Sequence, residues 1–192
     1  MDSAQEQPTI RCIFQASQTG LLAAGHCGPI LGCNRRCLWR HCARQKTCTC
    51  WLLPGVAEAL ELLRQAGFLN IVVTNQPDVG AGKVQRATVD SMHARLLETL
   101  AIDAVKVCFH SDAEGCACRK PKPGMLLEAA REHGIDLAAS AMVGDRWRDV
   151  GAAHAAGCKP YFLDCGYSEK RPDKPYVAVK SLAEAAEIIL QS

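Results

Sequence analysis

The sequence predicts a three-layer α/β fold, in which a mainly parallel β-sheet is covered by helices on both faces. From Leu52 onward, short apolar runs alternate with amphipathic helical patterns, which is typical of sheets built from strand–helix–strand units. The chain has 192 residues, 48% of them hydrophobic, which is enough for one well-buried domain. We therefore expect a core over residues 52–192, preceded by a different segment over residues 1–51.

The helices and strands of this core follow from the apolar pattern. A helix opens at Pro54-Gly55 and ends before Gly67, because apolar residues at positions 56, 59, 60 and 63 recur at helical spacing. A strand rich in β-branched residues over 68–74 comes next. The remaining elements are helices over 86–100, 124–133, 149–156 and 181–190, the last with Ser181 as N-cap, and strands over 105–109, 141–143 and 160–163. The inward residues of the helix over 86–100 are predicted to be Val89, Met92, Leu96 and Leu97.

One loop carries the spacing of a metal site. Cys108-Phe109-His110 is followed by Cys116-Ala117-Cys118, and Arg119-Lys120-Pro121 comes directly after. Three thiolates and one imidazole suit a tetrahedral zinc ion, which needs no further ligand. The competing interpretation is four unrelated residues in a chain that holds 12 cysteines. We predict that Cys108, His110, Cys116 and Cys118 bind a structural zinc ion, which holds Arg119 and Lys120 rigidly against an anion.

Polar residues follow two of the predicted strands, at the sheet edge where active sites of parallel sheets form. Thr74-Asn75-Gln76 ends the strand over 68–74 and could hold phosphate oxygens, although an ordinary cap is the simpler interpretation. Asp145 follows the strand over 141–143 and could bind Mg²⁺, whereas Asp149 is as easily explained as a helix N-cap. For Lys120 the alternative is a solvated surface lysine. Positive charge suited to an anionic ligand comes from Arg119, Lys122, Arg146 and Arg148.

The segment before this core has a different composition. Between Gln7 and Ala57 there is no Asp or Glu, and the same stretch holds seven of the 12 cysteines, six of them between residues 27 and 50, and arginines at intervals. A second metal module or an RNA-binding arm would fit a basic, cysteine-rich run. The cysteines at 33, 37, 42, 48 and 50 match no paired C-x-x-C spacing, however, and aromatic residues for base stacking are nearly absent. Neither reading is favoured.

Charge and hydropathy exclude several classes. A net charge of +2 and 22% charged residues argue against disorder and against broad nucleic-acid binding. No apolar run approaches the roughly 20 residues of a membrane span, and the first eight residues carry no signal-peptide pattern. With these observations, 12 cysteines fit a reducing compartment better than a secreted miniprotein. We expect a cytoplasmic monomer without nucleic-acid or membrane partners.

Taken together, these pieces resemble the haloacid-dehalogenase (HAD) phosphatase superfamily, and most closely its zinc-containing branch of heptose 1,7-bisphosphate 7-phosphatases and histidinol-phosphate phosphatases. The resemblance implies a Rossmann-like fold without a large cap domain. It also implies a Mg²⁺-dependent phosphomonoesterase acting on a small phosphorylated sugar, with a heptose favoured over histidinol phosphate. The matching segments, in family order, are Leu53-Pro54-Gly55-Val56, Val72-Val73-Thr74-Asn75-Gln76, residues 108–121, Pro123-Gly124-Met125 and Met142-Val143-Gly144-Asp145.

The resemblance assigns roles to individual residues. By it, Thr74, Asn75 and Gln76 contact the phosphate, and Arg119 and Lys120 neutralise its charge. Asp145 holds the catalytic Mg²⁺, and Arg146 lies near the substrate. Lys120 and Asp145 are the catalytic residues that the resemblance transfers to this chain.

The defining motif of the family is missing. Its first strand ends in Asp-x-Asp-Gly, where the first Asp attacks phosphorus and the second acts as acid and base. Residues 10–14 could form that strand, but Gln15-Ala16-Ser17-Gln18-Thr19-Gly20 follows. One hypothesis is a shifted reading frame, because codon degeneracy allows Gly28 to Arg36, read one nucleotide later, to encode Val-Leu-Phe-Leu-Asp-Ala-Thr-Gly. The rival hypothesis is a pseudoenzyme that binds phosphate without cleaving it.

Overall fold

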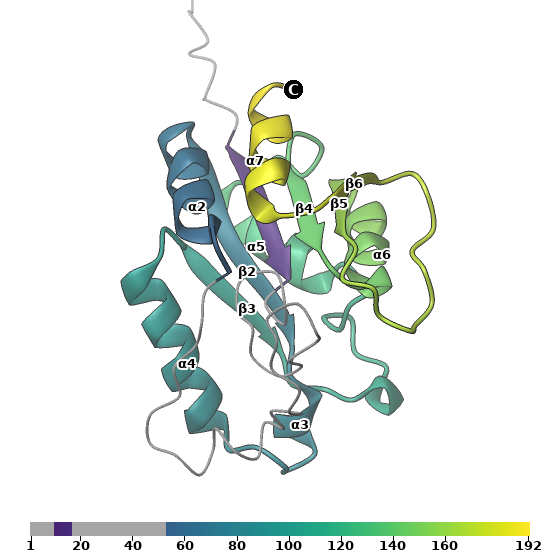
Figure 1. Ribbon diagram of the computed structural model, residues 1–192. Helices are drawn as coiled ribbons and strands as arrows, with labels where there is room; N and C mark the ends of the chain where they lie inside the picture. Colours follow the sequence, from purple (N-terminus) through teal and green to yellow (C-terminus); the bar gives the residue numbers. More distant parts are fainter. Residues whose placement is uncertain (1–9, 17–52) are drawn as a thin grey trace, which may run out of the picture.

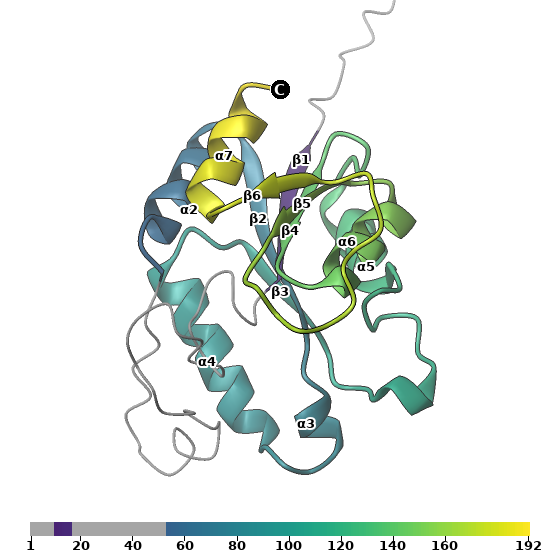
Figure 2. The ribbon, with the colours of Figure 1, turned by 45° about the vertical axis from the view of Figure 1, so that its right-hand side comes forward.

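A computed structural model describes residues 10–16 and 53–192 of the chain. Six parallel strands form one sheet in the order β3-β2-β1-β4-β5-β6, with helices packed on its two faces (Figures 1 and 2). The three-layer α/β fold predicted from the sequence is confirmed. No connection between strands holds a separate cap domain in the part of the chain that the structure describes.

The element bounds match the sequence pattern closely. The strands are β1 (Arg11–Ala16), β2 (Phe68–Asn75), β3 (Ala104–Cys108), β4 (Ala141–Gly144), β5 (Lys159–Leu163) and β6 (Val177–Val179). The helices are α2 (Val56–Gln65), α3 (Pro77–Gly80), α4 (Arg86–Thr99), α5 (Gly124–His133), α6 (Trp147–Ala156) and α7 (Leu182–Leu190), with a short 3₁₀ turn η2 (Asp112–Glu114). Ser181 caps α7 as predicted, because its hydroxyl accepts a hydrogen bond from the Glu184 N–H at 3.1 Å.

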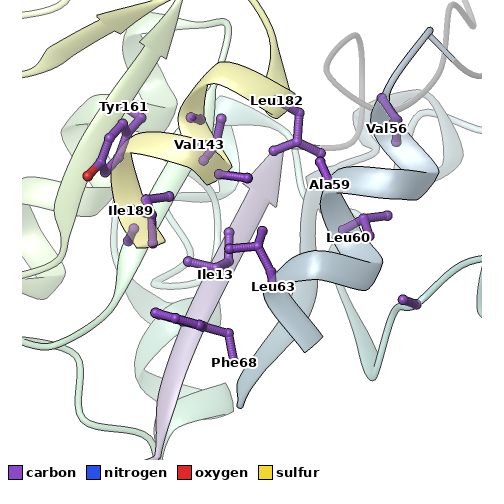
Figure 3. Close-up of a cluster of buried hydrophobic side chains, with 14 of the residues drawn as sticks. Ile13, Val56, Ala59, Leu60, Leu63, Phe68, Val143, Tyr161, Leu182 and Ile189 are labelled. Carbon is purple, nitrogen blue, oxygen red and sulfur yellow. The ribbon is translucent and has the colours of Figure 1, made fainter. Parts of the chain in front are cut away.

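The core lies on both faces of the sheet. On one face α2 and α7 pack over Ile13 and Val143, and the inward residues of α2 are those that the helical spacing predicted (Figure 3). On the other face α5 and α6 pack over Ile71 and Met142. Burying a side chain of this size contributes about 1.5–3 kcal/mol, so both faces stabilise the sheet that carries the site.

Two expectations were wrong in detail, and one strand was missed. Leu97 was expected to face inward, but it is 43% exposed, because the buried stripe of α4 is narrow and Leu97 lies off its edge. Phe109 falls outside β3, which ends at Cys108. The sequence pattern also missed β6, whose three residues are too few to show a strand period.

The N-terminal segment is only partly described. Residues 11–16 form β1 between β2 and β4, at the centre of the sheet, so this part of the segment joins the core. The cysteine-rich run between residues 27 and 50 and the residues after Ala16 that should carry the family motif lie outside the described residues. Every helix of the described residues is too short or too polar to be a membrane span.

Candidate active site

Cys108, His110, Cys116 and Cys118 come together at the end of β3. Their ligand atoms all lie within 4.8 Å of one another, and the three Sγ–Sγ distances are 3.3, 3.4 and 3.7 Å. Tetrahedral zinc with bonds of about 2.3 Å to sulfur requires sulfur atoms about 3.8 Å apart. The Nδ1 atom of His110 lies 3.3 Å from the Cys118 sulfur and 3.6 Å from that of Cys108. The donor set and its spacing therefore fit a zinc ion.

The thiols of this cluster differ in pKa. Burial raises the pKa of the Cys108 thiol to about 12. Burial also opposes ionisation of Cys116, but hydrogen bonds from Cys118 and the Arg119 backbone hold the Cys116 pKa at about 7. Because zinc binds thiolates, its uptake would displace the proton of Cys108.

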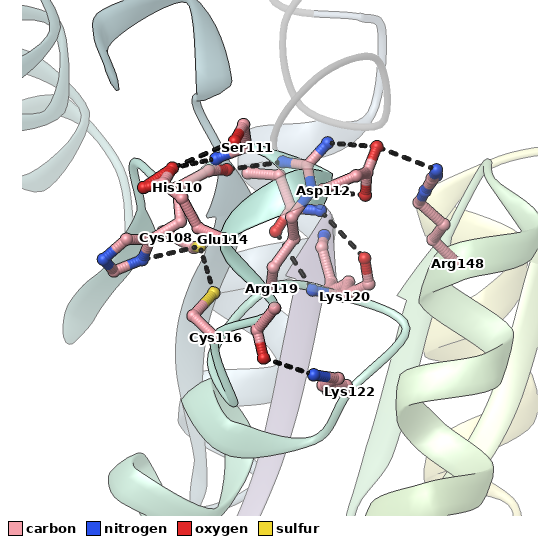
Figure 4. A network of polar contacts seen from close by, with 12 residues as sticks. Cys108, His110, Ser111, Asp112, Glu114, Cys116, Arg119, Lys120, Lys122 and Arg148 are labelled. Carbon is pink, nitrogen blue, oxygen red and sulfur yellow. Dashed lines mark hydrogen bonds and ion pairs between the residues drawn. The ribbon is translucent and has the colours of Figure 1, made fainter. Parts of the chain in front are cut away.

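Hydrogen bonds of Arg119 hold the loop beside the Cys/His cluster. The Arg119 guanidinium donates from Nε to Asp112 Oδ1 at 2.7 Å and from Nη1 to the His110 carbonyl at 3.1 Å. Asp112 also accepts from Arg148 Nη2 at 3.4 Å (Figure 4). One carboxylate of the loop thus joins a guanidinium of the loop to one from α6.

Lys120 is a buried, paired cation, and not the solvated lysine that the sequence also allowed. Its side chain points below the loop toward β2, with Nζ 2.7 Å from Asp149 Oδ1 and 2.8 Å from the Val73 carbonyl that accepts its hydrogen bond. The residue is 4% exposed. The Asn75 amide bonds both the N–H and the C=O of Lys120 at 3.2 Å, so β2 holds this part of the loop.

For Asp149 the sequence left a site role and a helix N-cap equally open, and the structure places it in the pocket. Helix α6 begins at Trp147, two residues earlier than predicted, and Asp149 in its first turn accepts a hydrogen bond from the Arg146 N–H at 2.9 Å. Gly144 makes room for it, because a Cβ on Gly144 would lie 2.3 Å from the Asp149 Cβ. The available signal was its spacing of four residues from Asp145, which puts both carboxylates at the same end of α6.

Asp145 is a buried carboxylate that the surrounding protein satisfies poorly. It is 2% exposed, and neither carboxylate oxygen makes a hydrogen bond of good geometry within the described residues. The nearest cation is Arg146, with Nε 3.7 Å from Oδ2. A buried carboxylate left this way is costly, and an oxygen-preferring divalent cation such as Mg²⁺ would satisfy it.

Residues that follow β2 and β4, together with the loop after the Cys/His cluster, line one pocket of about 230 Å³ at the carboxyl edge of the sheet. Of the residues predicted to bind substrate, the pocket brings together Asn75, Arg119, Lys120 and Arg146, and it adds Asp145, which was predicted to bind Mg²⁺. Thr74 and Gln76 do not line it, since Thr74 is fully buried and its hydroxyl accepts from Gln76 Nε2 at 3.2 Å. Pro77, Arg148, Asp149 and Glu169 also line it among the described residues.

Glu169 reaches the pocket from the segment between β5 and β6. Its Oε1 lies 3.1 Å from Arg146 Nη1, and the Arg146 guanidinium lies 3.7 Å from the centre of the Tyr167 ring. Neither residue could be found from the sequence, because the segment from 164 to 176 has no periodicity.

Strand β1 ends at the same edge. Gln15 pairs with Val72 of β2 and Val143 of β4, so the backbone leaves β1 between the strands that lead to Thr74 and Asp145. This is where the resemblance expects the nucleophilic Asp, and the chain has Gln15 there.

Asp145 should make the metal-free protein less stable as the pH rises. Burial and the nearby Asp149 raise its pKa from 3.8 to about 6, so the folded protein holds this proton more tightly than the unfolded chain. The resulting stabilisation is complete below about pH 4 and is lost by about pH 6, a change of about 3 kcal/mol. We therefore expect the difference in unfolding free energy between the Asp145→Asn variant and the wild type to shift in favour of the variant when the pH is raised from 4 to 7.5.

Urea unfolding of both proteins at the two pH values, in Mg²⁺-free buffer, measures this difference. An equal gap between variant and wild type at both pH values would contradict the raised pKa.

Comparisons with known proteins agree with the site. Residues 117–185 match the family described as HAD-hydrolase-like. The chain is 37% identical over 153 residues to the D-glycero-beta-D-manno-heptose-1,7-bisphosphate 7-phosphatase of Bordetella bronchiseptica, covering 73% of this chain and 85% of the relative. The enzyme of the same name from Pseudomonas aeruginosa is 36% identical, over 76% of this chain and 88% of the relative.

A solved structure shows the same architecture. The crystal structure of the B. bronchiseptica D,D-heptose 1,7-bisphosphate phosphatase, complexed with magnesium and phosphate, superposes with a TM-score of 0.72 at 30% identity. It covers 95% of this chain and 99% of that one. On the strength of these relatives and the shared sheet, the chain belongs to the HAD phosphatase family.

Proposed function

We propose that this chain carries the site of a Mg²⁺-dependent HAD phosphomonoesterase that acts on a phosphorylated sugar, with D-glycero-D-manno-heptose 1,7-bisphosphate losing its 7-phosphate. The observation that carries the proposal is the pocket in which Lys120, Asp145 and Asp149 meet beside the Cys/His cluster. The named activity of the relatives supports the substrate.

The pocket residues divide the work of binding a phosphoryl group. Lys120 supplies positive charge at the pocket floor, where Asp149 and Val73 fix its ammonium. Arg119 adds charge from the loop, and the Asn75 amide fixes the backbone of Lys120. Thr74 and Gln76, which the resemblance also assigns to the phosphate, bond each other and do not line this pocket, so we give them no direct phosphate contact. Because the site is partly buried, these charges act more strongly than they would in water.

Two metal ions complete the proposal. Asp145 would hold Mg²⁺, which supplies charge neutralisation to the phosphoryl oxygens when bound. Cys108, His110, Cys116 and Cys118 would hold a structural zinc ion that keeps the loop closed. A reducing compartment such as the cytoplasm suits this site, because all six cysteines of the described residues are free thiols.

The chain as written lacks the nucleophile of this reaction. An Asp at the end of β1 would attack phosphorus, and an amide such as that of Gln15 is a far poorer nucleophile. Removing a nucleophile typically lowers turnover by several orders of magnitude. This observation favours a second candidate function, a non-catalytic protein that binds phosphate esters in the same pocket.

A phosphate-release assay with the heptose bisphosphate and Mg²⁺ separates the two functions. We expect the wild type to bind orthophosphate but to release almost none from substrate, and the Gln15→Asp/Ser17→Asp variant to gain turnover by several orders of magnitude. Adding Lys120→Met to that variant is the control and should remove the gain.

Turnover by the wild type near the level of the restored variant would contradict the role given to the first strand. Binding without turnover in both proteins would favour the non-catalytic function.

We further propose that residues 1–51, apart from the strand β1 that joins the sheet, form a segment distinct from the phosphatase core at 52–192, and that a shifted reading frame produced part of it. The DNA sequence across codons 8–52 tests this proposal. An uninterrupted frame that preserves these residues in related genes would end it.

A further inference from the structure

Glu169 is an unexpected residue for a phosphate pocket. Among the residues that the structure describes, the lining contains four cations, Arg119, Lys120, Arg146 and Arg148, and three carboxylates, Asp145, Asp149 and Glu169. Asp149 is committed to Lys120 at 2.7 Å, and Asp145 is buried in the position proposed for Mg²⁺. Glu169 is the lining carboxylate that the phosphate chemistry does not use, and its charge repels a phosphate ester.

The structure holds this carboxylate at the pocket wall. Glu169 and Arg146 form an ion pair at 3.1 Å with side chains 33% and 29% exposed, and Arg146 is stacked on Tyr167. The backbone of Arg146 is fixed in turn by its hydrogen bond to Asp149. A carboxylate has about four acceptor positions, so an ion pair through Oε1 leaves capacity for a ligand.

We propose that Glu169 is a specificity-determining residue that accepts hydrogen bonds from hydroxyl groups of the substrate, and so selects polyhydroxylated phosphate esters. The inference rests on the proposed function and names the part of the substrate that is not phosphate. Hydroxyl groups donate to a carboxylate through strong charge-assisted hydrogen bonds, which offsets the repulsion between Glu169 and the phosphate.

A ligand ammonium group is the other chemistry that a carboxylate recognises. The four cations of the same lining would repel it, and Arg146 already supplies positive charge to Glu169. Neutral hydroxyl donors are therefore the better match. The proposal thus favours a sugar phosphate over an amino-alcohol phosphate such as histidinol phosphate.

Calorimetric titration with three probes in the presence of Mg²⁺ tests the proposal. The probes are D-mannose 6-phosphate, hexyl phosphate without hydroxyl groups, and inorganic phosphate. Losing a hydrogen bond to a charged group weakens binding by roughly ten- to hundred-fold. We therefore expect Glu169→Ala to weaken mannose 6-phosphate at least about ten-fold, and to leave the other two unchanged or slightly tighter. Glu187→Gln, an exposed carboxylate on α7 away from the pocket lining, is the matched control and should change none of them.

Equal changes for all three probes would show an electrostatic effect alone and overturn the proposal. It would also be overturned if O-phosphoethanolamine, added as a fourth probe, lost more affinity than mannose 6-phosphate. Inorganic phosphate that failed to bind the wild type would refute the proposed function itself, which distinguishes that failure from a wrong role for Glu169. Glu169→Gln, with thermal unfolding of each variant, shows that a loss of folding is not the cause.

Discussion

Replacing Cys108 by Ser is expected to remove one equivalent of zinc from the chain and to open the loop from 108 to 122. Cys108 is fully buried at the end of β3, and its sulfur lies 3.3 Å from that of Cys118. Structural zinc sites in small peptides contribute about 10–16 kcal/mol of apparent binding free energy. A typical domain has only about 5–15 kcal/mol of stability, so losing even part of the zinc contribution should bring this fold close to unfolding.

The effect should reach the pocket. Arg119 and Lys120 follow Cys118 directly, and Arg119 is held through Asp112 and the His110 carbonyl. Releasing the loop therefore removes the supports of Arg119 and frees the backbone that leads into Lys120, whose side chain is still held by Asp149 and Val73. We expect orthophosphate affinity to fall together with the unfolding temperature.

Zinc content by mass spectrometry, thermal unfolding and phosphate titration measure the three effects. Cys165→Ser is the control, because Cys165 is a free thiol of the described residues outside the cluster. A Cys108→Ser protein that keeps the zinc content of the wild type would show that the cluster is not the metal site.

The fold was predictable because its signals are local. The inward residues of α2 and the β-branched run of β2 are visible in the sequence, and so are the glycines and prolines between the elements. The burial of Leu97 was predicted wrongly and β6 was missed, because local patterns have limits. A helical pattern does not show how wide the covered stripe is, and three residues cannot establish a strand period.

The candidate site was predictable where ligands lie close in the chain. Cys108 and Cys118 are ten residues apart, and their spacing indicated a shared ion. The pairing of Lys120 with Asp149 joins residues 29 positions apart through the order of strands in the sheet, and no local pattern contains that order. Glu169 depends on the path of an irregular segment and gave no signal at all.

Replacing Lys120 by Met is expected to destabilise the protein by about 3–5 kcal/mol, because it leaves the buried Asp149 carboxylate without its partner. The Val73 carbonyl also loses its donor. Orthophosphate binding should weaken at least about ten-fold, since a charge-assisted hydrogen bond is lost. Lys122→Met is the matched control: Lys122 is exposed on the same loop and bonds the Gly115 carbonyl, so its loss should change stability by no more than about 0.5 kcal/mol.

A double variant separates the loss of stability from the loss of phosphate binding. A buried ion pair contributes little net stability compared with well-packed apolar residues, although breaking one partner is costly. Lys120→Met combined with Asp149→Leu should therefore recover much of the stability that Lys120→Met alone loses. Phosphate binding should stay weak, because no cation returns to the pocket floor.

Urea unfolding and phosphate titration of the wild type, Lys120→Met, Lys122→Met and the double variant measure both effects. If binding recovered together with stability in the double variant, Lys120 would support the pocket only by holding the fold. Stability without binding would instead mean that this ammonium group remains buried, at a desolvation cost, because the phosphoryl group needs a charge at the end of β2.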